Sequence, residues 1–283
     1  MSGAQRGMAA TVNPATAASL AQQVPDGALL ALAPDYSGCA LAVVRELVRR
    51  PVRGLRLLGV PQLGLQADLL VGAGCVAEVE AAAVSLGEHG LAPAFLRAAA
   101  DGTIRVRDST CPAIHAGLTA AERGVPFLPL RGVLGSDLVR WRTDWRVIDD
   151  PFAPGRPVLL VPAIRPDLAL FHAERVDAAQ NVWIGVRREL MTMAHAAHAT
   201  LVSAEARSAT DLLADPVAAA GTLPGLYVTA TAIVPQGAAP TGCGGLYRRD
   251  DAVYARYVEL AATPRGFARF LDAWLADDDL HAA

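Results

Sequence analysis

Short apolar runs alternate with longer amphipathic stretches along most of the chain. Runs of strand length or strand composition lie at 28–33, 55–60, 68–71, 103–107, 127–130, 158–161, 168–173, 200–203 and 227–234. Stretches of helical composition lie at 13–23, 40–50, 77–85, 95–100, 113–123, 187–199, 253–262 and 267–276. Strands that are apolar on both faces are typical of parallel sheets covered by helices. The order therefore predicts an α/β fold with an open, mostly parallel sheet and helices on both faces.

Breaks in this pattern indicate the domain limits. We expect residues 1–12 to form a disordered leader and residues 13–283 to form a single domain. Segment 141–157 is rich in Asp, Arg and Pro, so it is either an excursion over the surface or a boundary between two lobes. We find no internal repeat of fixed period.

The composition argues against some classes of function. The net charge is −3 and aromatic residues make up only 5% of the chain, which disfavours a nucleic-acid binder. All basic residues apart from histidine are arginine, so Schiff-base chemistry on a lysine side chain is excluded. We see neither a signal peptide nor an uninterrupted apolar span, and we expect a cytoplasmic protein.

Cysteine and histidine positions give no strong metal signal. The four cysteines are widely spaced without a C-x-x-C pair, and we interpret Cys75 and Cys111 as buried, inert thiols. His195 and His198 lie three residues apart on a predicted helix, but alanines surround them and no third ligand is visible. We interpret this pair as a helix face, predict no metal site, and expect His172 to be a core histidine with satisfied hydrogen bonds.

Two glycines follow the predicted strand 68–71. Gly72 and Gly74 resemble the start of a dinucleotide-binding fingerprint, with Ala77 in the place of its third glycine. Such a fingerprint needs an acidic residue about 20 positions further on to bind the ribose. Residues 91–100 contain no Asp or Glu, so we reject binding of NAD.

Four sequence stretches carry a family resemblance. They are DLLVGAG at 68–74, GVPFLPLRGVLGSDL at 124–138, RPDLALFHAERVD at 165–177 with QNV at 180–182, and LPGLYV at 223–228 with PQGAAP at 235–240. In this order they resemble the alpha subunits of class I coenzyme A transferases, particularly the glutaconate CoA-transferase type. Two positions depart from that pattern: Gln180 stands where the family has glycine, and PDYSGC at 34–39 replaces a glycine-rich loop that approaches CoA.

The resemblance implies several properties of the molecule. It implies an open α/β fold, and pairing with a beta-type subunit, with two copies of each. An acyl-CoA site is expected between the subunits, with the coenzyme A thioester as substrate and no bound cofactor. It also implies that the loop containing Arg131, Gly135, Ser136 and Asp137 lies near the active site, where Arg131 and Asp137 would hold a substrate carboxylate or fix the loop; a buried ion pair between them is the structural alternative. Gly72, Gly74 and His89 are further candidates for binding the substrate or shaping a loop.

A glycine-flanked glutamate is the sharpest candidate for chemistry. The stretch Gly87-Glu88-His89-Gly90 resembles the S-E-N-G stretch of the family, which normally lies on the beta subunit. A carboxylate that attacks a thioester forms an acyl anhydride and then a glutamyl-CoA thioester, so the acyl group stays activated. Glycines at Gly87 and Gly90 would expose the carboxylate and free backbone N–H groups for an oxyanion. Alternatively, the stretch is only an exposed surface turn.

Four functions remain open from the sequence. The first is a CoA-transferase subunit that uses Glu88. The second is a subunit of the related steroid-ring-opening CoA hydrolases, which the resemblance associates with a working glutamate on the alpha chain. The third is a non-catalytic subunit that supports a glutamate of the beta chain. The fourth is a ligand-sensing regulator of the same superfamily, which the lack of a helix-turn-helix pattern disfavours.

Overall fold

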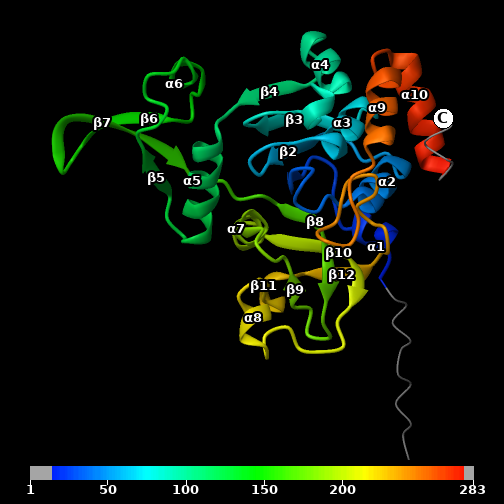
Figure 1. The fold of residues 1–283 in the computed structure, drawn as a ribbon. Coiled ribbons are helices and arrows are strands. Elements are labelled where there is room, and N and C mark those ends of the chain that lie inside the picture. Colours follow the sequence, from blue (N-terminus) through cyan, green and yellow to red (C-terminus); the bar gives the residue numbers. More distant parts are fainter. Residues whose placement is uncertain (1–14, 277–283) are drawn as a thin grey trace, which may run out of the picture.

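The computed structural model describes residues 15–276. The main body of the molecule is a parallel sheet covered by helices (Figure 1). The parallel strands lie in the order β12-β10-β8-β1-β2-β3-β4, with β9 and β11 added antiparallel beside the end of β8. Their bounds are β1 Leu29–Leu32, β2 Leu55–Gly59, β3 Val76–Ala81, β4 Arg105–Asp108, β8 Leu168–Val176, β9 Val182–Trp183, β10 Ala199–Arg207, β11 Thr222–Leu223 and β12 Ala230–Ile233. The predicted open, mostly parallel α/β fold is confirmed.

Helices cover both faces of this sheet because successive strand residues point to opposite sides. In β1, Leu30 and Leu32 face one apolar core, whereas Ala31 faces the other. The leucine side packs against α1 Ala17–Ala21, α2 Leu41–Arg49, α3 Leu65–Gly72, α4 Pro93–Ala100, α9 Asp251–Ala261 and α10 Pro264–Ala276. The alanine side packs against α5 Cys111–Glu122 and α7 Arg188–Ala196.

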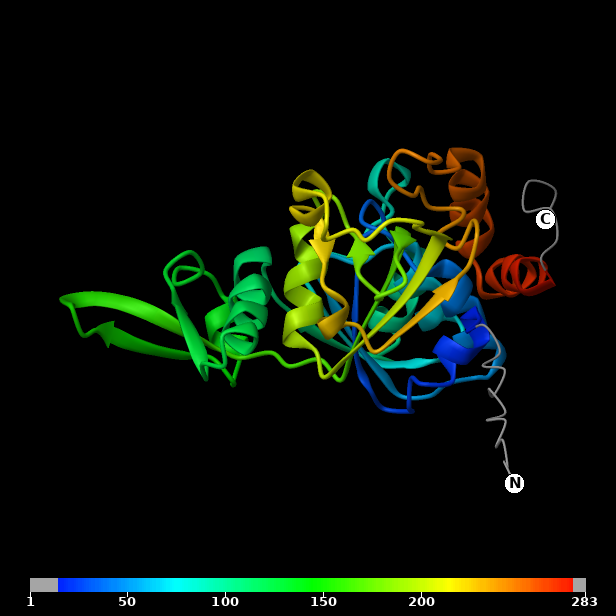
Figure 2. The same ribbon diagram turned by 90° about the horizontal axis from the view of Figure 1, so that it is seen from below.

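A second, antiparallel sheet projects from the main body. It consists of β5 Phe127–Leu130, β7 Ala153–Pro162 and β6 Arg146–Asp150, in that spatial order, and α6 Leu138–Trp141 lies in the β5–β6 connection. Figure 2 shows it extending away from the parallel sheet, beside α5. Trp145, Leu159 and Val161 form a small core with α5. Segment 141–157 is therefore largely the β6–β7 hairpin of this projection, while the single-domain limits 13–283 remain a prediction.

Two predicted elements are wrong. Segment 68–71 belongs to α3, and segment 77–85 contains the strand β3 in place of a helix. Residues Leu65 to Val71 are all buried, so α3 lacks a polar face and its apolar run cannot be distinguished from a strand by periodicity. The alanines and glutamates of 77–85 have helical propensity, but pairing with β2 and β4 overrides it.

The remaining differences are small. Within the described residues, the predicted helix 13–23 is observed as α1, and positions 13 and 14 lie outside them. The strand expected at 227–234 is observed as η2 Gly225–Tyr227 followed by β12. A short helix, α8, spans Pro216–Ala219. The expected leader at 1–12 lies outside the described residues. Within 15–276, no helix is both long and apolar enough to cross a membrane.

The β8–β9 turn has Gln180 where the family motif has glycine. Gln180 adopts a left-handed backbone conformation, with φ of 63°. The Asp177 carboxylate accepts hydrogen bonds from the backbone N–H groups of Ala179, Asn181 and Leu212, each of 2.9 Å. Although burial raises the pKa of Asp177, these bonds and one from the Asn181 side chain lower it overall. A carboxylate that organises the whole turn can hold a non-glycine residue in this conformation.

Candidate functional site

Two adjoining hollows lie at the carboxyl ends of the central strands. The larger has a volume of about 560 Å³ and is lined by residues from 34–36, 62–63, 85–87 and 242–251 together with Arg187. The smaller has a volume of about 210 Å³ and is lined by residues from 36–38, 172–174, 183–187 and 243–244 together with Leu190. Open α/β sheets bind ligands at this edge, where neighbouring connections leave the sheet in opposite directions. Here that point lies between β1 and β8.

Glu88 lies at the rim of the larger hollow, on a short 3₁₀ turn. The turn is η1 Gly87–His89, which follows β3, and the Glu88 side chain is 93% exposed. Gly87 and Gly90 have φ of 66° and 99°, which disfavour a side chain at either position. Their N–H groups donate to the Ser85 hydroxyl and the Gly87 carbonyl. These two N–H groups are therefore engaged within the turn, contrary to our expectation that they would be free for an oxyanion.

The Glu88 turn is fixed to the start of α9 by charged groups. Arg249 lies 3.7 Å from the Glu88 carboxylate, and its Nε donates to Asp251 at 2.6 Å. His89 Nε2 is 3.0 Å from the same Asp251 oxygen. The hydrogen bonds from His89 and then Arg249 hold the pKa of Asp251 below its usual range. Arg249 thus places positive charge beside a carboxylate that faces solvent.

The loop after β1 forms the floor of the larger hollow. Asp35 accepts hydrogen bonds from the Tyr254 hydroxyl at 2.7 Å and from the N–H of Leu65 at 3.0 Å. Burial raises the pKa of Asp35, although these bonds oppose the rise. A Cβ at Gly64 would lie 2.2 Å from the Asp35 carboxylate, so only glycine fits there. This aspartate is a structural anchor for the loop that replaces the family's glycine-rich segment.

A hydrogen-bonded cluster lies behind the smaller hollow. His172 contacts the Ser203 hydroxyl at 2.8 Å and Glu205 at 2.7 Å, which confirms that it is a satisfied core histidine. Glu205 also accepts from the Tyr247 hydroxyl at 2.5 Å and the Gln236 N–H at 2.8 Å. Ligand atoms of His172, Glu205 and Cys243 lie within 4.8 Å of one another. His172 and Glu205 are hydrogen-bonded to each other in this cluster, and burial raises the pKa of the Cys243 thiol to about 12.

We expect Glu205→Gln to reduce the acid sensitivity of the fold. Burial raises the pKa of Glu205, but hydrogen bonds from His172, Tyr247 and Gln236 outweigh it and lower the value to about 2. A carboxyl group whose pKa is lowered by folding stabilises the fold when the pH is above its unfolded-state pKa. This stabilisation is lost as the pH falls toward the folded-state pKa of about 2. Between pH 5 and pH 3 the parent should therefore lose about 2 kcal/mol more unfolding free energy than the variant. Urea denaturation at both pH values measures this, and equal losses would contradict it.

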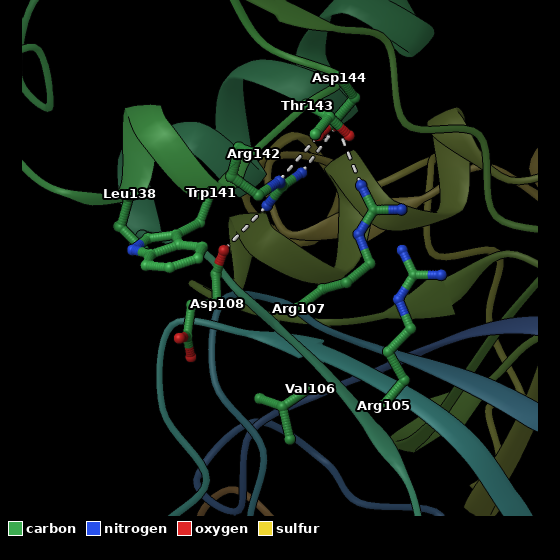
Figure 3. A pocket seen from close by; sticks show the side chains of 9 residues that line it. All are labelled: Arg105, Val106, Arg107, Asp108, Leu138, Trp141, Arg142, Thr143 and Asp144. Atoms are coloured by element: carbon green, nitrogen blue, oxygen red, sulfur yellow. Dashed lines mark hydrogen bonds and ion pairs between the residues drawn. The ribbon is translucent and has the colours of Figure 1, made fainter.

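A third hollow, of about 360 Å³, lies at the edge strand β4 beside α6 (Figure 3). Arg142 binds Glu80 at 2.8 Å and Asp144 at 2.9 Å, and Arg107 binds Asp144 at 3.0 Å. Arg105 pairs with Glu78 at 3.2 Å. Every arginine here therefore has an acidic partner. We interpret this hollow as a structural ion-pair network that joins the sheet edge to the projecting part of the chain.

The structure brings together only some of the residues proposed from the sequence. Glu88, Gly87, His89 and Gly90 share one turn at the larger hollow. Gly72 and Gly74 lie at and after the end of α3 instead, where a Cβ on Gly72 would lie 2.2 Å from Phe267. These two glycines are explained by helix packing and by the turn after α3.

The loop expected near the active site lies in the projecting sheet. Arg131 pairs with Asp150 at 2.7 Å, and Asp137 pairs with Arg140 at 3.2 Å. The alternative of a buried Arg131–Asp137 pair is therefore wrong. Gly135 and Ser136 lie in the same loop, where the Ser136 hydroxyl donates to the Val133 carbonyl at 2.8 Å. None of these residues lines either central hollow in the described chain, and their role in a site would require a partner protein.

The remaining candidates from the sequence are His195, Cys75 and Cys111, and none of them lines a central hollow in the described chain. His195 contacts Glu122 at 2.9 Å and stacks on Tyr227, in agreement with a helix-face role. Cys75 is buried, as expected, and burial raises the pKa of its thiol to about 11. Cys111 is exposed at the first position of α5, so its expected burial is wrong.

Several polar residues of the hollows were not predicted from the sequence, among them Asp35, Arg187, Arg249 and Asp251. Arg249 and Asp251 are 161 and more positions from Glu88, so no local spacing connects them, although the side chains are adjacent in the fold. Asp35 could have been noticed because it follows a buried strand and precedes a glycine, a common place for a binding loop. Arg187 carries no such signal.

Comparison with known proteins gives consistent matches. The model of a family described as coenzyme A transferase matches residues 14–227. One subunit of the glutaconate CoA-transferase of Acidaminococcus fermentans is 30% identical over 83% of this chain and 78% of the relative. The cholesterol ring-cleaving hydrolase IpdA subunit of Rhodococcus jostii is 33% identical over 86% of this chain and 85% of the relative.

Solved structures agree with these relatives. A variant of the decarboxylase AibA/AibB has 32% identity and a TM-score of 0.81, covering 93% of this chain and 97% of the matched chain. One relative is considerably longer: this chain spans 53% of an uncharacterised protein from Archaeoglobus fulgidus, at 31% identity over 83% of this chain. The similarity therefore covers nearly the whole described fold.

Proposed function

Because this chain belongs to the coenzyme A transferase family, we propose that it is the alpha-type subunit of an enzyme that uses Glu88 on an acyl-CoA thioester. The observation that supports this most directly is the position of the Glu88 carboxylate. It is 93% exposed on a glycine-flanked turn, at the rim of the larger hollow and 3.7 Å from Arg249. An exposed carboxylate beside a cation and a cavity is suited to attack a bound carbonyl.

The reaction we propose proceeds by two exchanges of bonds. Glu88 attacks the thioester carbonyl, the C–S bond breaks, and an acyl-glutamyl anhydride and coenzyme A thiolate form. The thiolate then attacks the glutamyl carbonyl, which releases the donor acid and leaves a glutamyl-CoA thioester. An acceptor carboxylate reverses both steps and leaves as the new acyl-CoA. Arg249 is near enough to stabilise negative charge that develops beside Glu88.

A beta-type partner would complete this site. The glutaconate CoA-transferase and IpdA relatives are both named as subunits, and so as parts of larger enzymes, which supports a partner for this chain. The carboxylate of Glu88 faces solvent in the single chain, whereas a covalent intermediate needs protection from water. We propose a heterotetramer in which the partner covers the Glu88 rim.

A hydrolase is the alternative function. The IpdA relative, named as a cholesterol ring-cleaving hydrolase, matches this chain over 86% of its length. In that case Glu88 would deliver water or attack a carbon centre, and no glutamyl thioester need accumulate. A second alternative is that Glu88 only supports a glutamate of the partner.

Product analysis with covalent trapping distinguishes these functions. The purified complex would be incubated with glutaryl-CoA and acetate, with and without borohydride, followed by peptide mass mapping. A transferase should form acetyl-CoA, and borohydride should reduce the thioester on Glu88 to an alcohol. A hydrolase should give a product of water addition without that adduct, and an adduct on the partner alone would make Glu88 a supporting residue. A complex that converts neither this nor other acyl-CoA thioesters would overturn the proposal.

A further inference from the structure

Three side chains of different chemistry converge behind the smaller hollow. His172 on β8, Glu205 on β10 and Cys243 in the connection from β12 to α9 each offer a ligand atom, and these atoms all lie within 4.8 Å of one another. His172 and Cys243 also line the hollow itself. An imidazole nitrogen, a carboxylate oxygen and a sulfur form a donor set that zinc accepts in proteins. The three positions are far apart in sequence, so no local spacing marks them, and the sequence alone predicted no metal site.

The His172 ring is oriented in the way that a metal ligand requires. Its Nδ1 lies 2.8 Å from the Ser203 hydroxyl, and its Nε2 lies 2.7 Å from Glu205 Oε1. When Nδ1–H donates to Ser203, the Nε2 lone pair faces the carboxylate, so a proton or a metal ion has to lie between the two acceptors. A Cβ at Gly237 would lie 2.6 Å from the ring, so the loop after β12 packs directly on it. Histidines that bind metals typically have their second ring nitrogen held by such a partner.

Glu205 is also held by groups that can remain in place when a metal binds. Its Oε1 accepts from the Tyr247 hydroxyl at 2.5 Å, and its Oε2 accepts from the Gln236 N–H at 2.8 Å. His172 Nε2 and Glu205 Oε1 are 2.7 Å apart. Bonds of about 2.1 Å at tetrahedral angles place two zinc ligands about 3.3 Å apart, so these two atoms need to separate by only about 0.6 Å.

The charge around the cluster favours a cation. Besides Glu205, the half-buried carboxylate of Glu174 lines the smaller hollow, and a Cβ at Gly244 would lie 1.8 Å from its Oε1. In the described part of the chain, neither of these two carboxylates pairs with an arginine. Arg187 lines the same hollow but stacks on the Tyr36 ring. A divalent cation at the cluster would therefore offset negative charge that is otherwise compensated only by a shared proton.

We propose that His172 Nε2, Glu205 Oε1 and Cys243 Sγ bind one divalent cation of the zinc type, with a fourth position open to the smaller hollow. Binding displaces the thiol proton of Cys243 and any proton shared by His172 and Glu205. Sites with three protein ligands leave the fourth position to water or to a group of a bound molecule. The ion would fix the connection that carries Cys243 to β8 and β10, and the same connection leads to Arg249 beside Glu88. This inference does not depend on the proposed reaction.

Titration with cobalt(II) and zinc(II) tests the site without turnover. The purified protein would first be treated with a chelator, and Cys111→Ser would be present in all samples because the Cys111 thiol is exposed. Cobalt should bind with a thiolate-to-metal charge-transfer band, and zinc should displace it with a Kd of about 1 µM or lower. If neither ion binds at about 100 µM, or if cobalt binds without that band, the proposal is wrong.

Substitution of the ligands identifies the site. Cys243→Ser should abolish the band and weaken zinc binding by at least about 100-fold, and Glu205→Gln should weaken zinc binding to a similar extent while keeping the band. Cys75→Ser removes another buried thiol, outside both central hollows, and should change neither. Zinc should raise the urea midpoint of Cys75→Ser but not of Cys243→Ser. Equal zinc affinity in these two variants would overturn the proposal. Circular dichroism checks that each variant folds, and the band in the Cys111→Ser protein decides the outcome if Cys243→Ser does not.

Discussion

Glu88→Gln should lower the kcat of the complex by at least about 100-fold, because the loss of a covalent route removes several kcal/mol of transition-state stabilisation. The amide keeps the shape of the side chain but is not a nucleophile. The ion pair with Arg249 is 3.7 Å long and highly exposed on the Glu88 side, so its loss should change stability little. Steady-state kinetics together with equilibrium binding of acyl-CoA would show a slow chemical step with binding retained.

An exposed glutamate elsewhere provides the matched control for Glu88. Glu259 is 71% exposed on α9 and pairs with Arg256 one turn away. Glu259→Gln makes the same chemical change outside the hollows and should retain the parent rate. If the Glu88→Gln complex turns over as fast as this control, the catalytic residue lies on the partner and this chain has a supporting role.

Asp68→Ala should cost at least about 3 kcal/mol of unfolding free energy, the largest stability effect that we expect from a polar residue. The Asp68 carboxylate is fully buried and accepts from the N–H groups of Ala94 at 3.2 Å and Phe95 at 2.6 Å. It also accepts from the Tyr257 hydroxyl at 2.6 Å. Alanine would leave three buried donors without an acceptor, each of which costs about 1–3 kcal/mol.

The hydrogen bonds at Asp68 also explain why Asp68→Ala should destabilise the fold more than Tyr257→Phe. The N–H groups of Ala94 and Phe95 belong to the first turn of α4, where backbone N–H groups have no acceptor within the helix. Asp68 on α3 therefore caps α4 from a different helix. Tyr257→Phe removes only one donor and leaves two bonds to the carboxylate, so it should cost about 1 kcal/mol. Urea denaturation of both variants measures the difference. A cost below that of Tyr257→Phe would show that the cap contributes little.

Elements of the fold were predicted correctly where a local sequence pattern marks them, and incorrectly where tertiary packing determines the secondary structure. Strands β1, β2, β8 and β10 follow apolar runs flanked by turn residues, and their positions were anticipated to within a few residues. By contrast, 68–71 is apolar because α3 is enclosed on all sides, and a buried helix has no amphipathic signature. The glutamates of β3 pair with arginines that lie more than 20 residues away, at Arg105, Arg107 and Arg142.

The candidate site shows the same division. The glycines beside Glu88 predicted an exposed turn, because positive backbone angles leave a local mark in sequence. Its neighbours Arg249 and Arg187 come from distant parts of the chain and carry no such mark. The family motif around Arg131 lies on the projecting sheet, so its expected proximity to the active site depends on how a partner protein is placed.

The position of α5 between two cores restricts how this sequence can evolve. Ile114, Leu118 and Ala121 pack against the parallel sheet, whereas Ala113 and Ala116 pack against the projecting one. A Cβ at Gly117, on the same helix, would lie 2.5 Å from the Ile164 side chain. Enlarging most residues of α5 would therefore disturb one core or the other, and each such change would need a compensating change in the core that it disturbs. We expect α5 to drift slowly among relatives even though it contributes no residue to the central hollows.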